Sequence, residues 1–132
     1  MAVSRFVFLA RRADDSDRDA PHDDVTWMLV SSNSRPLGRS VRWYHDLGEC
    51  LSDVETLRSR ADTLRAVMSA VSSGRSWQWR LDLDGTPAAV ASRLYIRQYE
   101  CEYNMRRFLE ALRVASIPSA VRTIHRGPAA AK

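Results

Sequence analysis

The stretches "WMLVSSNSRPLGRSVRWYHDLGEC" at residues 27–50 and "WRLDLDGTPAAVASRLYIRQYEC" at residues 79–101 are two versions of one pattern. Identical residues recur 52 positions apart at the start of the two stretches and 51 positions apart toward their ends: Trp27 and Trp79, Leu29 and Leu81, Ser40 and Ser92, Tyr44 and Tyr95, Glu49 and Glu100, and Cys50 and Cys101. The offset changes between Ser40 and Tyr44, where one residue has been gained or lost. The chain is therefore predicted to be a tandem duplication of one small unit.

Apolar residues that follow the two cysteines repeat at the spacing of one helix face. Steps of four, three and four residues connect the members of two series: Cys50, Val54, Leu57 and Ala61, and Cys101, Met105, Phe108 and Leu112. This spacing predicts amphipathic helices over residues 46–62 and 97–115. Asp46 and Glu49 have the spacing of a capping box at the start of the first helix. Pro118 is expected to stop the second helix, because proline lacks the amide proton that a helical turn needs.

Strands are expected ahead of each helix, because apolar and polar residues alternate around Trp27 and Trp79. Asp84-Gly85 predicts a hairpin turn in the second copy, and "SNSRP" at residues 32–36 predicts one in the first. Three further strands are predicted at "RFVFLA", "RAVMSAV" and "SAVRTIH", which are residues 5–10, 65–71 and 119–125.

The resulting order, βββα, βββα, β, predicts an α+β fold in which two helices cover one face of an antiparallel sheet. We expect a single domain, residues 1–132, made of two repeats. The repeats are residues 5–64 and residues 65–125, the second including the final strand. The acidic segment at residues 11–24 is expected to form a mobile loop, and residues 126–132 a disordered tail.

Length and composition favour one globular unit, since the chain has 132 residues of which 45% are hydrophobic. No apolar run reaches the roughly 18 residues that span a bilayer. The opening "RFVFLA" is too short, and too soon followed by Arg11 and Arg12, for a signal peptide. We therefore expect a cytoplasmic protein without membrane contact. Cys50 and Cys101 fit reduced thiols that pack in the core.

The net charge of +4 is unevenly distributed along the chain. Residues 1–24 carry four arginines and six aspartates, whereas the remainder carries 16 basic and 10 acidic residues. Six basic residues lie toward the C-terminal end: Arg106, Arg107, Arg113, Arg122, Arg126 and Lys132. Such a basic end is typical of a surface for an anionic partner. The chain has 19 arginines but a single lysine, a bias that codon usage in a GC-rich genome alone would produce.

The repeated order Trp-x-Leu, Ser, Tyr and Cys resembles the YegP-like family, a domain of unknown function found singly or as tandem βββα repeats. The second copy keeps the family's spacings, and the first has one extra residue between its Ser and Tyr while keeping Asn33. The family commonly has Asn-Gly shortly after the Cys position, where this chain has Ser52-Asp53 and Tyr103-Asn104. The resemblance spans residues 5–125 and implies a fold without an established activity. It also implies that single-repeat members pair to build what tandem members build in one chain.

Metal-binding patterns are incomplete in this sequence. The segment "DSDRD" at residues 15–19 imitates the start of a calcium loop, but Ala20 and Thr26 stand where the loop needs Gly and Glu. The histidines show no zinc-ligand spacing: His22, His45 and His125. No glycine-rich phosphate loop occurs among the five glycines. We expect neither a metal nor a cofactor.

The candidate nucleophiles are two cysteines and two serines. Cys50 and Cys101 begin helices, where the helix dipole lowers a thiol pKa, but both continue apolar helix faces and are assigned to the core. Ser40 and Ser92 precede helices, a position typical of a side chain that hydrogen-bonds the backbone. We therefore predict no catalytic residues. An enzyme would need a polar cleft between the repeats, which the sequence does not reveal.

Aromatic residues beside arginines give the sharpest functional signal. Trp27 and Trp79 repeat in register and are assigned to the core, whereas four aromatics lack an aromatic counterpart and are expected to be exposed: Trp43, Trp77, Tyr99 and Tyr103. Exposed rings beside arginines stack single-stranded bases. The candidate nucleic-acid-binding residues are Arg106, Arg107, Arg113, Arg122, Arg126, Trp43 and Trp77.

The sequence favours a small non-catalytic protein with a structural or protein-interaction role, and nucleic-acid binding is the alternative. A sheet with residues 5–10 or 119–125 outermost would leave an edge strand for homodimer formation by strand pairing.

Overall fold

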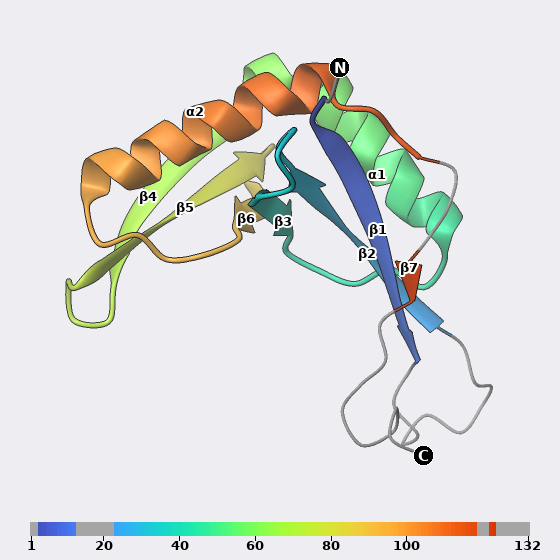
Figure 1. Cartoon of the computed structure of the whole chain (residues 1–132), viewed down its shortest axis with the longest axis horizontal. Helices are drawn as coiled ribbons and strands as arrows, with labels where there is room; N and C mark the ends of the chain where they lie inside the picture. The colour runs from blue at the N-terminus through green and yellow to red at the C-terminus, as the bar shows by residue number, and fades with distance from the viewer. Residues whose placement is uncertain (1–2, 13–22, 119–121, 124–132) are drawn as a thin grey trace.

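The computed structural model describes residues 3–12, 23–118 and 122–123 of the chain (Figure 1). Its helices and strands are, in chain order, β1 (Arg5–Arg12), β2 (Asp23–Val30), β3 (Pro36–Ser40), α1 (Leu47–Ser59), the short 3-10 helix η1 (Ala61–Thr63), β4 (Arg65–Val71), β5 (Ser76–Leu83), β6 (Thr86–Ala91), α2 (Gln98–Val114) and β7 (Arg122–Thr123). We call β1 to α1 the first half and β4 to α2 the second half.

One sheet of seven strands, in the order β4-β5-β6-β3-β2-β1-β7, runs through both halves. The strands from β4 to β1 pair antiparallel, as predicted, and β7 pairs parallel with β1. The halves meet where β3 pairs with β6. The outermost strands are β4 and β7. Residues 5–10 or 119–125 were predicted to be outermost. The second alternative agrees with the structure, because β7 lies within residues 119–125, whereas β1 lies between β2 and β7.

Both helices lie along the same side of the sheet, as predicted (Figure 1). The predicted boundaries of 46–62 and 97–115 are close to those observed, Leu47–Ser59 and Gln98–Val114. Asp46 caps α1, since its carboxylate accepts a 2.8 Å hydrogen bond from the Glu49 backbone N–H. The helix α2 ends four residues before Pro118, so the proline follows the end of the helix and does not itself mark it.

The core lies between the sheet and the helices. Trp27 and Trp79 are both fully buried, and the ring of Phe108 from α2 packs against each of them. A Cβ atom at Gly38 would lie 2.6 Å from Trp79 and 2.7 Å from Phe108. Only glycine therefore lets α2 pack this closely on β3.

Several predicted loop features can be compared with the structure. Asp84 and Gly85 have φ values of 53° and 81°, which confirms the predicted hairpin turn. The predicted loop at residues 11–24 is shorter than expected, because β1 continues to Arg12 and β2 starts at Asp23. The rest of that loop, residues 13–22, and the predicted tail, residues 126–132, lie outside the described residues. Among the described helices, none is long and apolar enough to cross a membrane.

Candidate functional site

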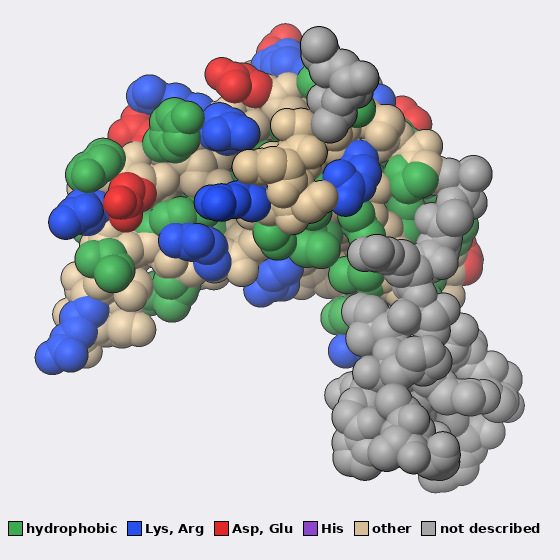
Figure 2. Space-filling model, viewed as in Figure 1, with side chains coloured by type: hydrophobic (Ala, Val, Ile, Leu, Met, Phe, Trp, Pro, Cys, Tyr) green, Lys and Arg blue, Asp and Glu red, His purple; other side chains and the backbone are tan. Residues whose placement is uncertain are grey.

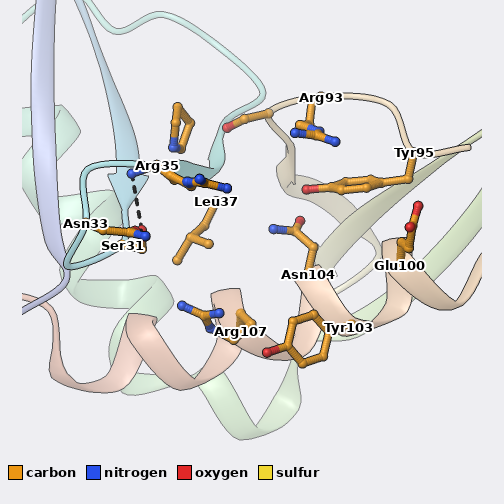
Figure 3. Close-up of a pocket in the computed structure, with 12 residues that line it drawn as sticks. Ser31, Asn33, Arg35, Leu37, Arg93, Tyr95, Glu100, Tyr103, Asn104 and Arg107 are labelled. Carbon is orange, nitrogen blue, oxygen red and sulfur yellow. Dashed lines mark hydrogen bonds between the residues drawn. The ribbon is translucent and has the colours of Figure 1, made fainter.

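A polar pocket of about 600 Å³ lies where the two halves meet (Figure 3). One wall is the turn between β2 and β3, the second is the segment after β6, and the third is the N-terminal part of α2. We call this cavity the α2 pocket. Its lining residues are Ser31, Asn33, Arg35, Pro36, Leu37, Ser92, Arg93, Tyr95, Glu100, Tyr103, Asn104 and Arg107.

The β2–β3 turn holds its wall of the pocket through its own hydrogen bonds. The Ser31 backbone N–H donates to the Arg35 carbonyl at 2.8 Å, and the Arg35 N–H donates to the Ser31 hydroxyl at 3.2 Å. Ser34 takes a positive φ of 67° at the tip. The Ser31 hydroxyl also donates to the Asn33 side-chain oxygen. These bonds fix the backbone from which the Arg35 side chain reaches the pocket.

The segment after β6 is held by a short bridge to β5. Trp77 and Tyr95 exchange two backbone hydrogen bonds, of 2.6 Å and 2.9 Å. The Arg93 guanidinium lies 4.8 Å from the centre of the Tyr95 ring, a cation–π contact. Burial raises the pKa of the Tyr95 phenol, so its hydroxyl is protonated and available as a donor at neutral pH.

The third wall consists of α2 side chains. Tyr103 and Arg107 are four residues apart on one helix face, and the guanidinium lies 5.9 Å from the ring centre. Asn104 is buried, and its side-chain oxygen accepts a 2.5 Å hydrogen bond from the Trp79 indole N–H. This bond fixes the oxygen of the amide against the core.

The pocket carries an excess of positive charge. Figure 3 shows Arg35, Arg93 and Arg107 around the cavity, and within the described part of the chain none of them forms an ion pair. The acidic residue of the lining, Glu100, lies 3.5 Å from Arg97. Arginine side chains also surround the surface between α2 and the β2–β3 turn in Figure 2. This arrangement is suited to holding an anion.

One buried polar atom of the pocket lacks a partner. The Ser92 hydroxyl oxygen is shielded from solvent and forms no hydrogen bond to any described residue. The equivalent Ser40 accepts a 3.1 Å bond from the Arg42 backbone N–H. The predicted role of these serines in hydrogen-bonding the backbone is therefore confirmed for Ser40 and wrong for Ser92.

The first half has a matching hollow of about 630 Å³, lined in part by Arg42, Tyr44 and Asp53. Tyr44 is placed as Tyr95 is, by two backbone hydrogen bonds to Val25, of 2.8 Å and 2.6 Å. Here the Asp53 carboxylate receives hydrogen bonds from Arg42 at 2.6 Å and from the Tyr44 hydroxyl at 2.5 Å. We call these three residues the first-half triad.

The predicted nucleic-acid-binding residues do not form one surface. Arg107 lines the α2 pocket, whereas Arg106 pairs with Glu102 at 2.6 Å and Arg113 pairs with Asp62 at 2.5 Å. Arg122 belongs to β7 at the far edge of the sheet, and Arg126 lies outside the described residues.

The aromatic predictions divide in the same way. Tyr99 and Tyr103 are exposed as predicted. Trp43 and Trp77 are half-buried, which differs from the predicted exposure. The Arg11 guanidinium lies 3.9 Å from the centre of the Trp43 ring, and Trp77 packs against the core. Sequence reasoning missed Arg35, which lies at the end of the β2–β3 turn, and Arg93, which lies just after the end of β6. The repeat contained the signal for Arg93, because its counterpart is Arg42 beside an equivalent tyrosine.

The remaining candidates are buried or fall outside the described residues. Cys50 and Cys101 are fully buried, as predicted, and burial raises the pKa of each thiol, to about 12 and about 11 respectively. The described residues contain no group of three or more His, Cys, Asp or Glu side chains arranged to hold a metal ion. The calcium-like segment at residues 15–19, with Ala20, His22 and His125, lies outside the described residues.

Comparison with known proteins identifies the fold. No protein-family model matches the sequence, and no curated protein matches it. Among solved structures, the chain resembles the protein of unknown function YegP from E. coli, with a TM-score of 0.64 at 13% identity, covering 96% of this chain and 97% of that one. It also resembles the UPF0339 protein SO3888 from Shewanella oneidensis, with a TM-score of 0.64 at 9% identity, covering 89% and 90%. The chain therefore has a YegP-like fold.

Proposed function

We propose that this chain is a small non-catalytic protein-interaction module of the YegP-like family, whose binding surface is the α2 pocket and the apolar side chains around it. One observation carries the proposal. Three arginines without ion-pair partners in the described structure, Arg35, Arg93 and Arg107, line a pocket beside exposed apolar residues. The pocket offers groups that bind and orient an anion.

The module is proposed to be a single domain of two duplicated units, residues 5–64 and 65–125. Three strands precede a helix in both halves. The bridges from Val25 to Tyr44 and from Trp77 to Tyr95 are at corresponding positions. Duplication explains why one sheet contains two equivalent hollows, of which the first has a carboxylate, Asp53, bonded to its own arginine and tyrosine.

The surface around the pocket fits a protein partner. Four large side chains are exposed along the β6–α2 segment and the first turns of α2: Leu94 (46%), Ile96 (78%), Tyr99 (65%) and Tyr103 (61%). Apolar residues clustered beside a charged pocket are typical of interaction sites. By charge complementarity, the partner segment carries acidic side chains alternating with apolar ones.

A synthetic peptide pair tests the proposal. We expect acetyl-Glu-Phe-Asp-Leu-Glu-amide to shift the amide NMR signals of residues 92–107, and its Gln and Asn counterpart to do so far less. Arg107→Gln should weaken binding by about tenfold, the loss of one hydrogen bond to a charged group. Arg106→Gln is the matched control, because that neighbouring arginine lies outside the pocket and pairs with Glu102. Equal binding of both peptides, or of neither, would contradict the proposal.

Nucleic-acid binding is the second candidate, favoured by the exposed Tyr103 ring beside Arg107. Fluorescence anisotropy of labelled single-stranded RNA, single-stranded DNA and duplex DNA, at low and moderate salt, separates the two functions. Binding that falls steeply with salt and is lost in Arg107→Gln would replace the protein partner with a nucleic acid. No binding at tens of micromolar would exclude this candidate.

Self-association is proposed to use β4, which pairs only with β5 and is an open edge among the described strands. Sedimentation over a range of concentrations should show a dimer. Ala66→Lys with Ala70→Lys should abolish it, because both residues are exposed on β4 and lysines disfavour edge pairing. A monomer at every concentration would contradict this.

The cytoplasmic location stays a prediction.

A further inference from the structure

We infer that the α2 pocket is a carboxylate-binding site, in which an acidic side chain of the partner takes the place that the Asp53 side chain occupies in the first half. The inference rests on the proposed function, because it names the chemical group that the module recognises. It comes from comparing two equivalent sites of one molecule, of which one carries its own carboxylate.

The first-half triad shows how this scaffold holds a carboxylate. One oxygen of Asp53 accepts from the Arg42 guanidinium at 2.6 Å and from the Tyr44 hydroxyl at 2.5 Å. Arg42 also lies over the Tyr44 ring at 4.8 Å. The Ser40 hydroxyl lies 3.5 Å from the Tyr44 oxygen and completes the set of polar groups. A cation and a phenol therefore hold one carboxylate, and the serine hydroxyl contacts the phenol.

The second half repeats this set without the carboxylate. Arg93 lies over the Tyr95 ring at the same distance, 4.8 Å, and Ser92 corresponds to Ser40. The residue 51 positions after Asp53 is Asn104, which is neutral and whose oxygen accepts from the Trp79 indole. Within the described residues, Arg93 therefore forms no ion pair to match the one between Arg42 and Asp53, and Glu100 of the same lining pairs with Arg97.

The unsatisfied groups of the pocket are those that a carboxylate would satisfy. The Ser92 hydroxyl is buried without a partner, which costs free energy until an acceptor arrives. The Tyr95 hydroxyl is a donor at neutral pH, and burial raises its pKa above the ordinary value. Arg35 and Arg107 add positive charge that the first hollow lacks, since neither lines it. A ligand carboxylate would thus accept from Arg93 and Tyr95, as Asp53 accepts from Arg42 and Tyr44.

A side-chain carboxylate is favoured over a larger oxyanion because the scaffold already holds one in the first half, bound by a single guanidinium and a phenol. The exposed Ile96 and Tyr99 beside the pocket would contact the apolar neighbours of that acidic residue. Free phosphate is the competing source of negative charge, and the experiment includes it.

The test titrates the full-length, isotope-labelled chain with N-acetyl-aspartate N-methylamide, its asparagine analogue and inorganic phosphate, at constant ionic strength. We expect the blocked aspartate to shift the Ser92 amide and the Arg93 side-chain signals, and the blocked asparagine to leave them unchanged. Asn104→Asp should weaken the response by about tenfold, because the new carboxylate occupies the site. Asp53→Asn should add a response at Arg42 and Tyr44 by emptying the first-half site. Arg106→Gln serves as the control that keeps the pocket intact.

The outcomes are distinct. A response to phosphate alone, an equal response to the blocked asparagine, or an unchanged response in a folded Asn104→Asp variant would each overturn the carboxylate site. If the acidic peptide of the previous subsection still binds around Tyr99 and Tyr103, the interaction module stands without this site. If the blocked aspartate binds but the peptide does not, the site stands and the module falls.

Discussion

The two halves of this molecule present the same polar site in two states. In the first half, Asp53 closes the site from within by accepting from Arg42 and Tyr44. In the second, Asn104 stands at the matching position and leaves Arg93 without an acidic partner among the described residues. The carboxylate of Asp53 makes the first site a structural ion pair, and the amide of Asn104 leaves the second site an open pocket. A fold with two such sites can therefore keep one as a stabilising element while the other is free to bind.

The scaffold around the two sites differs much less than their chemistry. The arginine-to-ring distance is 4.8 Å in both halves, and each tyrosine is placed by a two-bond backbone bridge. What changes is the wall that comes from the other half. The α2 pocket gains the β2–β3 turn with Arg35, whereas the described lining of the first hollow comes from residues 42–53 of its own half.

The largest effect is expected where the core holds Asn104 in place. Trp79→Phe removes the indole N–H, leaves the buried Asn104 oxygen without its donor and opens a small cavity, so it should destabilise the fold by about 2–3 kcal/mol. The freed amide would turn its oxygen toward Tyr95, and carboxylate binding should weaken with it. Urea unfolding followed by circular dichroism measures the stability.

Trp77→Phe is the matched control for that change, because Trp77 lies on the same strand but is only half-buried. Its cost should be less than half as large. If the two variants lost equal stability, the hydrogen bond to Asn104 would not be what distinguishes the second half.

A smaller effect is expected from opening the first-half site. Asp53→Asn replaces the charged acceptor shared by Arg42 and Tyr44 with a neutral amide. It should lower the free energy of unfolding by only about 1 kcal/mol, because the pair is partly exposed and screened by solvent. Asp62→Asn breaks a more exposed bridge to Arg113 and should cost about 0–0.5 kcal/mol. Equal losses in urea unfolding would show that the triad is no more than a surface ion pair.

Much of the fold was predictable from local patterns. The four-three-four spacing of Cys50, Val54, Leu57 and Ala61 placed α1 within three residues at each end, because helix periodicity depends on neighbours in sequence. The strand order was harder. That β4 is outermost and β7 parallel to β1 depends on pairings between residues far apart in sequence, for which hydrophobic alternation carries no information.

The site was less predictable than the fold for the same reason. A cluster of arginines near the C-terminus suggested one basic face, but Arg106 pairs with Glu102 one helical turn away, and Arg113 pairs with Asp62, which is 51 residues away in sequence. The first pair has a spacing that sequence indicates, and the second does not. Arg35 and Arg93 come together only because β3 pairs with β6 across the two halves. The matched positions Asp53 and Asn104 were visible in the repeat, yet their meaning required the contacts of each side chain.

The smallest expected effect concerns the two thiols, Cys50 and Cys101. Their environments differ in the same way as the two polar sites, because Asp53 lies near only the first. Burial raises the pKa of Cys50 to about 12, with the Asp53 charge adding to the rise, and burial alone raises the pKa of Cys101 to about 11. Above pH about 9 the unfolded chain loses thiol protons that the folded chain keeps, so stability should fall with rising pH until the folded thiols ionise.

Unfolding free energies measured from pH 8 to about 10.5 should therefore decline less steeply in Cys50→Ala than in the unmodified chain. Asp53→Asn should flatten this slope much less than Cys50→Ala, because burial is the main cause of the raised Cys50 pKa and the Asp53 charge only adds to it. If Asp53→Asn flattened the slope as much as Cys50→Ala, the Asp53 charge rather than burial would be the main cause, and the first-half site would control the ionisation of a core thiol.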